Sequence, residues 1–179
     1  RTLGGRAATH TKGEFHFNIG PHALYSGAAG IKVLRELGVP FKGSAPSASG
    51  GYAVDHGVKH ALPGGFVSLL TTGLLRVPGK LETARLLSSL PKVDTSRLQH
   101  LTVRQWLDTT IRNPDVRGLV QALFRVASYA NAPERQSAGA AIEQLQGALG
   151  SGVLYLDGGW QTLVDGLRAA AEAAGVRIV

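Results

Sequence analysis

The stretch that decides the fold runs from Val153 to Gly175 and reads VLYLDGGWQTLVDGLRAAAEAAG. Its first four residues are apolar and β-prone, and they predict a strand that ends at a turn of two consecutive glycines. After the turn, apolar residues at helical spacing predict a helix from Trp160 to Ala174, with Gly175 as its stop signal. The run from Val176 predicts the start of another strand, so this end of the chain is an α/β element.

The beginning of the chain is expected to belong with that element. It is glycine-rich and irregular, except that apolar and polar residues alternate from Glu14 to Ile19 and predict one short strand. Ile31, Leu34 and Leu37 then lie on one helical face, which predicts a helix over residues 27–37 that Gly38 ends. A β-hairpin is predicted over residues 52–62, with its turn at His56-Gly57.

The middle of the chain, from Phe66 to Leu149, has apolar residues at helical spacing almost throughout. Four apolar stripes can be recognised: Phe66, Leu69, Leu70, Leu74 and Val77; Leu81, Ala84, Leu87 and Leu90; Val116, Leu119, Val120, Leu123 and Ala127; Ala141, Ile142, Leu145 and Leu149. Two helix starts are marked, by a capping box from Thr102 to Gln105 and by Asn113 before Pro114. These signals predict a layer of packed helices and an α+β fold for the whole chain.

Composition limits the classes of protein. With 179 residues, of which 44% are hydrophobic, the chain can bury a sizeable core. The absence of cysteine excludes disulfides and thiolate metal sites and favours a cytoplasmic location. The six histidines lack the spacing of metal ligands, so no metal is expected. The longest uncharged apolar stretch, Ala61 to Leu75, is shorter than the roughly 20 residues of a membrane span.

The net charge of +7 is concentrated in the middle of the chain. Residues 76–125 hold nine Lys or Arg residues and four acidic residues. The basic residues are spread along amphipathic helices without interleaved aromatic residues, which argues against a nucleic-acid partner. Solvated helix faces and a peripheral contact with an anionic partner or membrane surface both remain compatible with this pattern.

Several motifs occur in a fixed order along the chain: LGGRA at 3–7, FNIGPH at 17–22, GVKHALP at 57–63, YLDGGWQTL at 155–163 and GVRI at 175–178. Together they resemble the superfamily of flavin-dependent amine oxidases, protoporphyrinogen oxidases and phytoene desaturases, over the whole chain. The resemblance implies an oxidoreductase that uses FAD and transfers a hydride to it from a substrate. Residues 1–26 and 151–179 would belong to the flavin domain. Residues 27–65, a helix and a hairpin, and the helices of 66–150 would form the substrate domain.

The resemblance also implies site residues. The cofactor-contacting residues would be Gly4, Gly5, Arg6, Gly20, Pro21, His22, Gly158 and Gly159. Consecutive glycines allow backbone amides to approach a phosphate or a flat ring, and an arginine adds a planar set of donors. Three aromatic residues are candidates to line an apolar substrate cavity: Tyr129, Tyr155 and Trp160. No catalytic residue can be named from the sequence.

One motif of the family is missing. No Gly-x-Gly-x-x-Gly occurs, so the unit that would hold the pyrophosphate is absent. The chain also contains no methionine and opens on Arg1, and we therefore expect an internal segment of a larger soluble enzyme, inactive without the rest of its parent chain. The substrate stays open between polyenes, porphyrinogens, amines and other apolar compounds. The alternative function is a helical module that docks on an acidic partner or a membrane surface.

Overall fold

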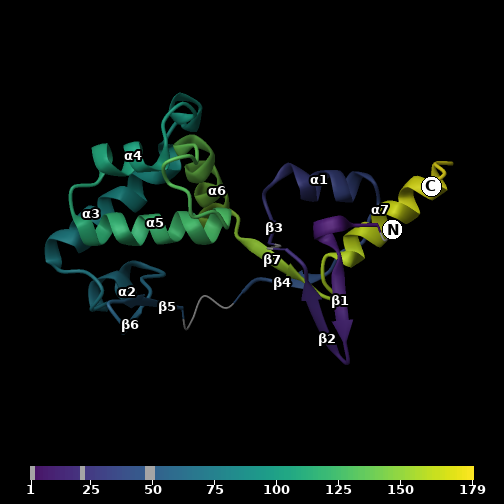
Figure 1. The fold of residues 1–179 in the computed structure, drawn as a ribbon, viewed down its shortest axis with the longest axis horizontal. Coiled ribbons are helices and arrows are strands. Elements are labelled where there is room, and N and C mark those ends of the chain that lie inside the picture. The colour runs from purple at the N-terminus through teal and green to yellow at the C-terminus, as the bar shows by residue number, and fades with distance from the viewer. Residues whose placement is uncertain (1–2, 21–22, 47–50) are drawn as a thin grey trace. The chain divides into compact units, whose positions relative to one another are not determined.

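The computed structural model describes residues 3–20, 23–46 and 51–179. Its internal contacts divide the chain into two compact units, residues 1–46 with 150–179 and residues 47–149. The first unit combines short strands with two helices, and the second is mainly helical (Figure 1). This arrangement confirms the predicted α+β class. No helix in the described part of the chain is long and apolar enough to cross a membrane.

The first unit holds two strand groups and two helices. Its elements are the 3₁₀ turn η1 (Gly5–Ala7), β1 (Thr9–Lys12), β2 (Phe15–Asn18), β3 (Leu24–Tyr25), α1 (Ala29–Glu36), β4 (Gly43–Ser44), β7 (Val153–Leu156) and α7 (Gln161–Ala173). β7 lies at the centre of a three-stranded antiparallel sheet in the order β3-β7-β4, and β1 pairs with β2 alone. The strand and helix predicted around the double-glycine turn are therefore confirmed.

Helix α1 packs in the first unit. Ile31 and Leu34 on α1 share one buried core with Leu156 of β7 and Leu163 of α7. Gly38 follows the helix with a φ of 67°, which is the left-handed stop that the sequence predicts. The sequence grouped this helix with the hairpin of residues 52–62, but contacts place the hairpin in the other unit.

Three strands, β1, β3 and β4, were not predicted from the sequence. The strand that was predicted from Val176 onward is absent. β1 carries four polar or charged residues without apolar alternation, and β3 and β4 are two residues long, so their sequences contain no period to detect. Residues 176–179 form no strand, because a strand needs a pairing partner and none of the described strands lies beside them.

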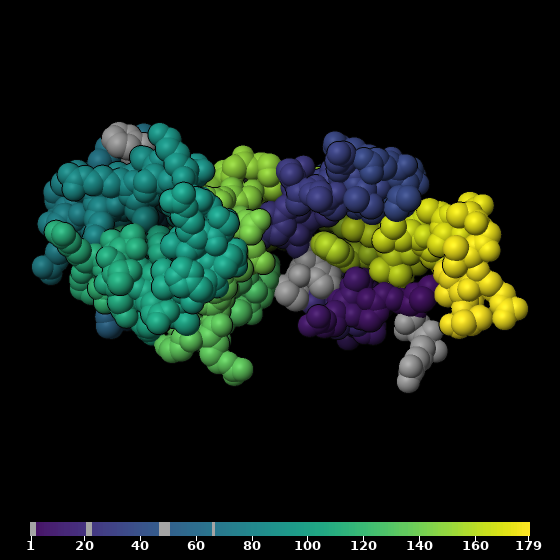
Figure 2. All heavy atoms as spheres, turned by 90° about the horizontal axis from the view of Figure 1, so that it is seen from above, coloured from purple at the N-terminus to yellow at the C-terminus, as the bar shows by residue number. Residues whose placement is uncertain are grey.

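The second unit contains the hairpin and the central helices. Its elements are β5 (Tyr52–Asp55), β6 (Val58–Ala61), α2 (Phe66–Thr71), α3 (Val77–Ser89), η2 (Leu90–Lys92), η3 (Thr95–Leu98), α4 (Val103–Thr110), α5 (Pro114–Ser128) and α6 (Ala138–Gly150). β5 and β6 pair from Tyr52↔Ala61 to Asp55↔Val58, as predicted. In the space-filling view, the teal and green side chains of this unit form one closely packed body (Figure 2).

Both predicted helix starts are present. At α4, the Gln105 backbone N–H donates to the Thr102 hydroxyl at 3.2 Å, and the Thr102 N–H donates to the Gln105 side chain at 2.9 Å. At α5, the Asn113 side-chain oxygen accepts from the N–H groups of Asp115 and Val116. Each cap satisfies donors that a helix N-terminus leaves without an intrahelical partner.

The first predicted stripe is interrupted. α2 ends at Thr71 and α3 begins at Val77, because the Thr72 hydroxyl donates to the carbonyl of Ala61 and accepts from the Leu74 N–H, which stabilises a turn. Leu75 is buried in this turn, whereas Val77 is exposed. The stripe of α5 is confirmed, since Val116, Leu119 and Val120 lie in the core.

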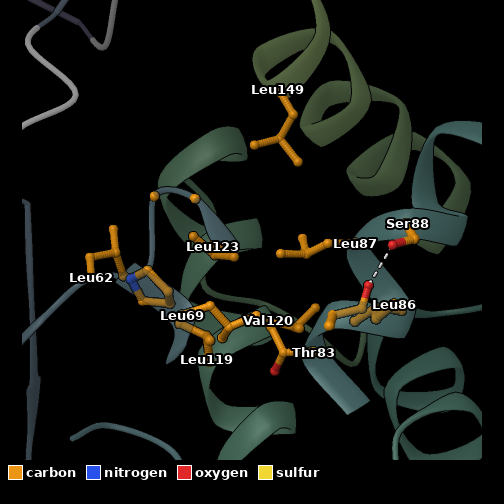
Figure 3. Close-up of a pocket in the computed structure, with 14 residues that line it drawn as sticks. Leu62, Leu69, Thr83, Leu86, Leu87, Ser88, Leu119, Val120, Leu123 and Leu149 are labelled. Atoms are coloured by element: carbon orange, nitrogen blue, oxygen red, sulfur yellow. Dashed lines mark hydrogen bonds between the residues drawn. The ribbon is translucent and has the colours of Figure 1, made fainter. Parts of the chain in front are cut away.

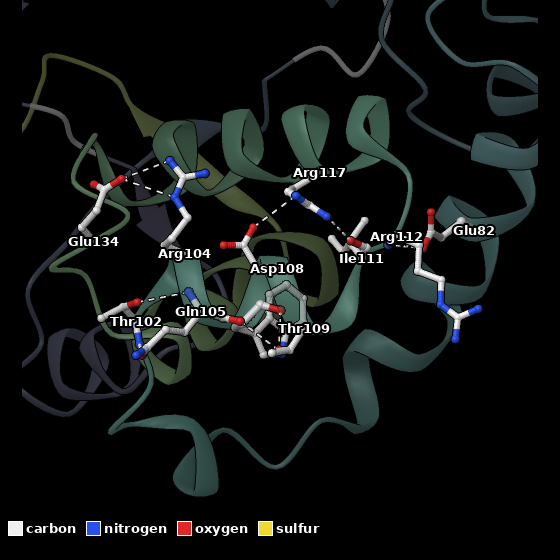
Figure 4. A network of polar contacts seen from close by, with 11 residues as sticks. Glu82, Thr102, Arg104, Gln105, Asp108, Thr109, Ile111, Arg112, Arg117 and Glu134 are labelled. Carbon is white, nitrogen blue, oxygen red and sulfur yellow. Dashed lines mark hydrogen bonds and ion pairs between the residues drawn. The ribbon is translucent and has the colours of Figure 1, made fainter.

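Polar contacts join α3, α4 and α5 (Figure 4). The two carboxylate oxygens of Glu82 accept from the backbone N–H groups of Arg112 and Asn113, at 2.8 and 2.9 Å. The guanidinium of Arg117 pairs with Asp108 at 3.2 Å and donates to the carbonyl of Ile111 at 2.8 Å. These contacts fix the segment between α4 and α5 against α3.

Candidate functional site

The Gly-Gly-Arg segment forms a tight turn at the start of the first unit. Gly4 and Gly5 have φ angles of 109° and 52°, which L side chains rarely adopt. The Ala7 N–H donates to the Gly4 carbonyl at 2.8 Å and closes the turn. A Cβ built on Gly5 would meet nothing within 4 Å, and Arg6 is exposed, so one side of this turn is open to a ligand.

The second glycine turn lies between β7 and α7. Gly158 and Gly159 have φ angles of 75° and 80°. A Cβ on Gly159 would lie 2.5 Å from the Thr9 hydroxyl oxygen and 2.7 Å from the Asn18 side-chain oxygen. A glycine is therefore needed here twice, for its left-handed backbone and for the close approach of the β1–β2 hairpin.

Thr9 and Asn18 clamp the hairpin onto the first turn of α7. The Asn18 side-chain oxygen accepts from the Thr9 hydroxyl at 2.8 Å and from the Trp160 backbone N–H at 3.0 Å. The Gln161 N–H donates to the Thr9 hydroxyl at 3.1 Å. Side chains from the N-terminal hairpin thus satisfy two donors at the start of a helix far along the chain. We call this set of three hydrogen bonds the Thr9–Asn18 clamp.

Three of the predicted cofactor residues lie beside the β1–β2 hairpin or beside α7. Gly159 touches the clamp, and a Cβ on Gly4 would lie 3.2 Å from the Val164 side chain of α7. Gly20 follows the hairpin two positions after Asn18. The predicted residues Pro21 and His22 lie outside the described residues. The sequence did not identify Thr9 and Asn18 as site residues. Asn18 belongs to the FNIGPH motif, and its position as a polar residue at the end of a strand could have indicated a role.

The three aromatic candidates occupy different environments. Tyr129 ends α5 in the left-handed region, with a φ of 54°, and is exposed in the second unit. Tyr155 is exposed on β7, whereas Trp160 packs against the core of the first unit. Their role as substrate contacts stays a prediction. Within residues 3–20, 23–46 and 51–179, no group of three or more His, Asp or Glu residues could hold a metal ion.

The second unit contains an apolar cavity of about 420 Å³ (Figure 3). Its wall comes from residues 62–65 and from helices α2, α3, α5 and α6. Much of it is leucine, including Leu62, Leu69, Leu87, Leu119, Leu123 and Leu149. None of the three aromatic candidates lines it.

The wall contains two hydroxyl groups. Ser88 donates its hydroxyl to the carbonyl of Ala84 at 2.8 Å, within its own helix. Thr83 also lines the cavity, and its hydroxyl oxygen is buried without a hydrogen-bond partner among the described residues. The cavity therefore offers a ligand mainly contacts with methyl and methylene groups.

Shifted pKa values occur on exposed surface pairs. The hydrogen bond from the Ser96 side chain lowers the pKa of Asp94. The pKa of Glu134 is lowered by its own backbone N–H and by the Arg104 guanidinium, and the bond to Glu172 raises the pKa of Arg168. None of these groups lies in the glycine turns or in the cavity wall, so they do not identify an acid or base for catalysis.

A comparison with protein families gives one match over almost the whole chain. The family model described as flavin containing amine oxidoreductase matches residues 2–179. No curated protein matches the chain as a relative. The match includes both glycine turns, the clamp and all helices of the second unit, and it confirms the resemblance drawn from the motifs. The chain belongs to the flavin-containing amine oxidoreductase family.

Proposed function

We propose that the chain is part of an FAD-dependent oxidoreductase in which a hydride passes from an apolar substrate to the flavin. The observation that carries this proposal is the Thr9–Asn18 clamp. It holds the segment that follows the Gly-Gly-Arg turn against the Gly158-Gly159 turn. The turn at Gly5 is open and lacks a Cβ atom, which suits a flat, polar cofactor because backbone amides can approach it closely, whereas the space beside Gly159 is taken by Thr9 and Asn18.

The residues of the Gly-Gly-Arg turn could contact one part of an FAD molecule. Gly5 leaves open space where a side chain would lie, and Arg6 adds a permanent positive charge and planar donors beside it. Bound FAD supplies the hydride acceptor, its N5 atom, which no amino-acid side chain can replace. Gly4, Gly5 and Arg6 would orient it by backbone and guanidinium contacts, and Gly159 would allow the hairpin to approach α7.

The pyrophosphate of FAD would be held elsewhere. The sequence has no Gly-x-Gly-x-x-Gly to bring backbone amides to the phosphates. A dinucleotide held at one side loses much of its burial and orientation. We therefore propose that residues 1–179 alone are inactive and that the remainder of a longer chain is their partner.

The substrate would be large and apolar, as in phytoene dehydrogenases. The cavity of about 420 Å³ falls within the range of small-molecule sites, and its wall offers contacts to hydrocarbon. A protonated amine would lose its hydration there without gaining a charged partner, because no charged residue lines the cavity, and this loss is costly. This argument favours a polyene or another hydrocarbon-rich compound over a small amine.

The test is the visible spectrum of the purified full-length protein. Oxidised flavin absorbance is expected, together with its bleaching under anaerobic conditions by an apolar polyene and no bleaching by benzylamine. Bleaching by the amine alone would contradict the substrate class. A full-length protein without flavin would contradict the oxidoreductase assignment and would favour a helical docking module, the second candidate, which the basic exposed helices of the second unit support.

A further inference from the structure

We propose that the hydroxyl group of Thr83 binds one uncharged oxygen atom of the ligand in the apolar cavity, so that this ligand is a hydrocarbon-rich compound with a hydroxyl or carbonyl group. The inference rests on the proposed function, in which the cavity holds the substrate, and it adds one polar feature to that substrate. Thr83 lies on α3 and lines the cavity (Figure 3). The residue is only 2% exposed, so its hydroxyl has lost its contact with bulk water.

The Thr83 hydroxyl differs from other hydroxyl groups in the helices. Several of those donate to a carbonyl of the preceding helical turn, namely those of Thr71, Ser88, Ser89, Thr109 and Ser128. The Thr83 oxygen has no hydrogen-bond partner among the described residues. Buried polar groups nearly always have a partner, because a buried group without one has lost its hydration for no return. An exception in the wall of a cavity therefore points to a partner that enters the cavity.

Thr83 can turn its hydroxyl to a ligand without a movement of α3. The space that its side chain borders is the apolar cavity. Rotation about the Cα–Cβ bond exchanges the positions of the methyl and hydroxyl groups, and threonines in helices occupy two such rotamers. Leu86 and Leu87, three and four positions later on the same helix, line the same cavity. A ligand bound there would therefore meet one hydroxyl group among hydrocarbon side chains.

A ligand oxygen fits this hydroxyl better than a buried water molecule. A buried water makes about three hydrogen bonds, and the other hydroxyl in the wall, that of Ser88, already donates to the carbonyl of Ala84. A hydrocarbon-rich ligand needs only one hydrogen bond, because leucine and valine side chains contact the rest of it. The oxygen is uncharged, since no charged residue lines the described wall and a carboxylate would be buried without a partner.

The experiment measures how two ligands of similar shape displace the dye Nile red from the full-length protein. Naphthalene is a pure hydrocarbon, and 2-naphthol adds one hydroxyl group that is uncharged at neutral pH. Thr83→Val replaces the hydroxyl of the protein by a methyl group. It should weaken the affinity for 2-naphthol about fivefold, which corresponds to one neutral hydrogen bond, and leave the affinity for naphthalene unchanged. Packing alone would change the two affinities together.

Two further variants are matched controls. Thr83→Ser keeps the hydroxyl group and should keep the wild-type ratio of the two affinities. Ser88→Ala removes a wall hydroxyl that bonds within its own helix, and it should leave this ratio unchanged.

Stability of the ligand-free protein gives a second measurement. Thr83→Val should raise the urea midpoint, because it removes a buried hydroxyl that has no partner. A lower midpoint would show that the hydroxyl is bonded within the protein and would overturn the proposal.

The binding results separate this inference from the proposed function. Displacement by both ligands, with the same affinity ratio in the wild type and in Thr83→Val, would overturn the role of Thr83 and leave the cavity as the substrate site. Displacement by neither ligand would overturn both the role of Thr83 and the use of the cavity. The FAD assignment is tested separately, by the visible spectrum of the same protein.

Discussion

The backbone N–H of Trp160 donates to the side-chain oxygen of Asn18 at 3.0 Å, across 142 positions of the sequence. This bond connects the hairpin at the beginning of the chain to the helix at its end. All residues of the second unit lie between them in sequence. The first unit is therefore built from two distant segments, and it can form only when both are in place.

Asn18→Ala should destabilise the protein by about 1–2 kcal/mol, since it removes the acceptor of the Trp160 N–H and of the Thr9 hydroxyl. Flavin content of the full-length protein should fall with it, because the hairpin loses its attachment to α7. Urea unfolding and flavin absorbance measure the two effects. Lys12→Ala, at an exposed position of the same hairpin, is the control. Equal stability of both variants would contradict the role of the clamp.

Gly159→Ala should cost about 3 kcal/mol or more of folding free energy. Its φ of 80° disfavours any side chain, and its Cβ would come within 2.7 Å of Thr9 and Asn18 atoms. Gly13→Ala is the matched control, because Gly13 has a φ of 62° but no atom within 4 Å of its Cβ. It should cost about 1 kcal/mol from backbone strain alone. If urea unfolding gave the same loss of folding free energy for both variants, the close approach of the hairpin to Gly159 would not contribute to the effect of Gly159→Ala.

The helices were the most predictable part of the fold. Capping at Thr102 and Asn113 is local chemistry, and the stripe of α5 repeats every three or four residues, so a short window of sequence contains the information. The break between α2 and α3 was not predicted, because it depends on the Thr72 hydroxyl reaching the carbonyl of Ala61. Such a contact depends on how β6 approaches the helix.

The candidate site was predictable only in its glycines. Gly4, Gly5, Gly158 and Gly159 were identified from motifs, and their left-handed φ angles agree with the need for glycine. Thr9 could not be found, because its role is a hydrogen bond to Gln161 and nothing in a run of polar residues marks a long-range contact. The apolar cavity likewise depends on how four helices pack, and no sequence period describes a space left between them.

Arg6→Ala should lower flavin occupancy of the full-length protein. Charge-assisted contacts of this kind are worth about 1.5–3 kcal/mol, so a roughly tenfold to 150-fold weaker affinity is expected. Folding should change little, because Arg6 is an exposed residue in a turn. Flavin titration of the apoprotein measures the affinity, with Arg35→Ala on α1 as a control of equal charge change. An unchanged affinity for flavin would mean that Arg6 is an ordinary surface residue and does not contact the cofactor.

Glu82→Ala should destabilise the second unit by about 2–3 kcal/mol. Its carboxylate accepts from the N–H groups of Arg112 and Asn113, and bonds to a charged acceptor are worth more than neutral ones. Glu143→Ala, which removes an exposed acid from α6, should have little effect. Urea unfolding of both variants compares them. A loss for Glu82→Ala no larger than for Glu143→Ala would show that the segment before α5 is held by other contacts.

Leu87→Trp should fill part of the apolar cavity without disturbing the core. Leu87 is half-buried in the cavity wall, and the space of about 420 Å³ can accept the larger ring. Binding of the apolar dye Nile red, read from its fluorescence, should weaken by about tenfold, as expected when a pocket loses its fit to a ligand. Flavin content should stay the same, because the glycine turns lie in the other unit. Val126→Trp enlarges an exposed side chain on α5 and should bind the dye like the wild type. Unchanged dye binding by Leu87→Trp would mean that apolar ligands do not occupy this cavity, and the proposed substrate site would have to be sought elsewhere.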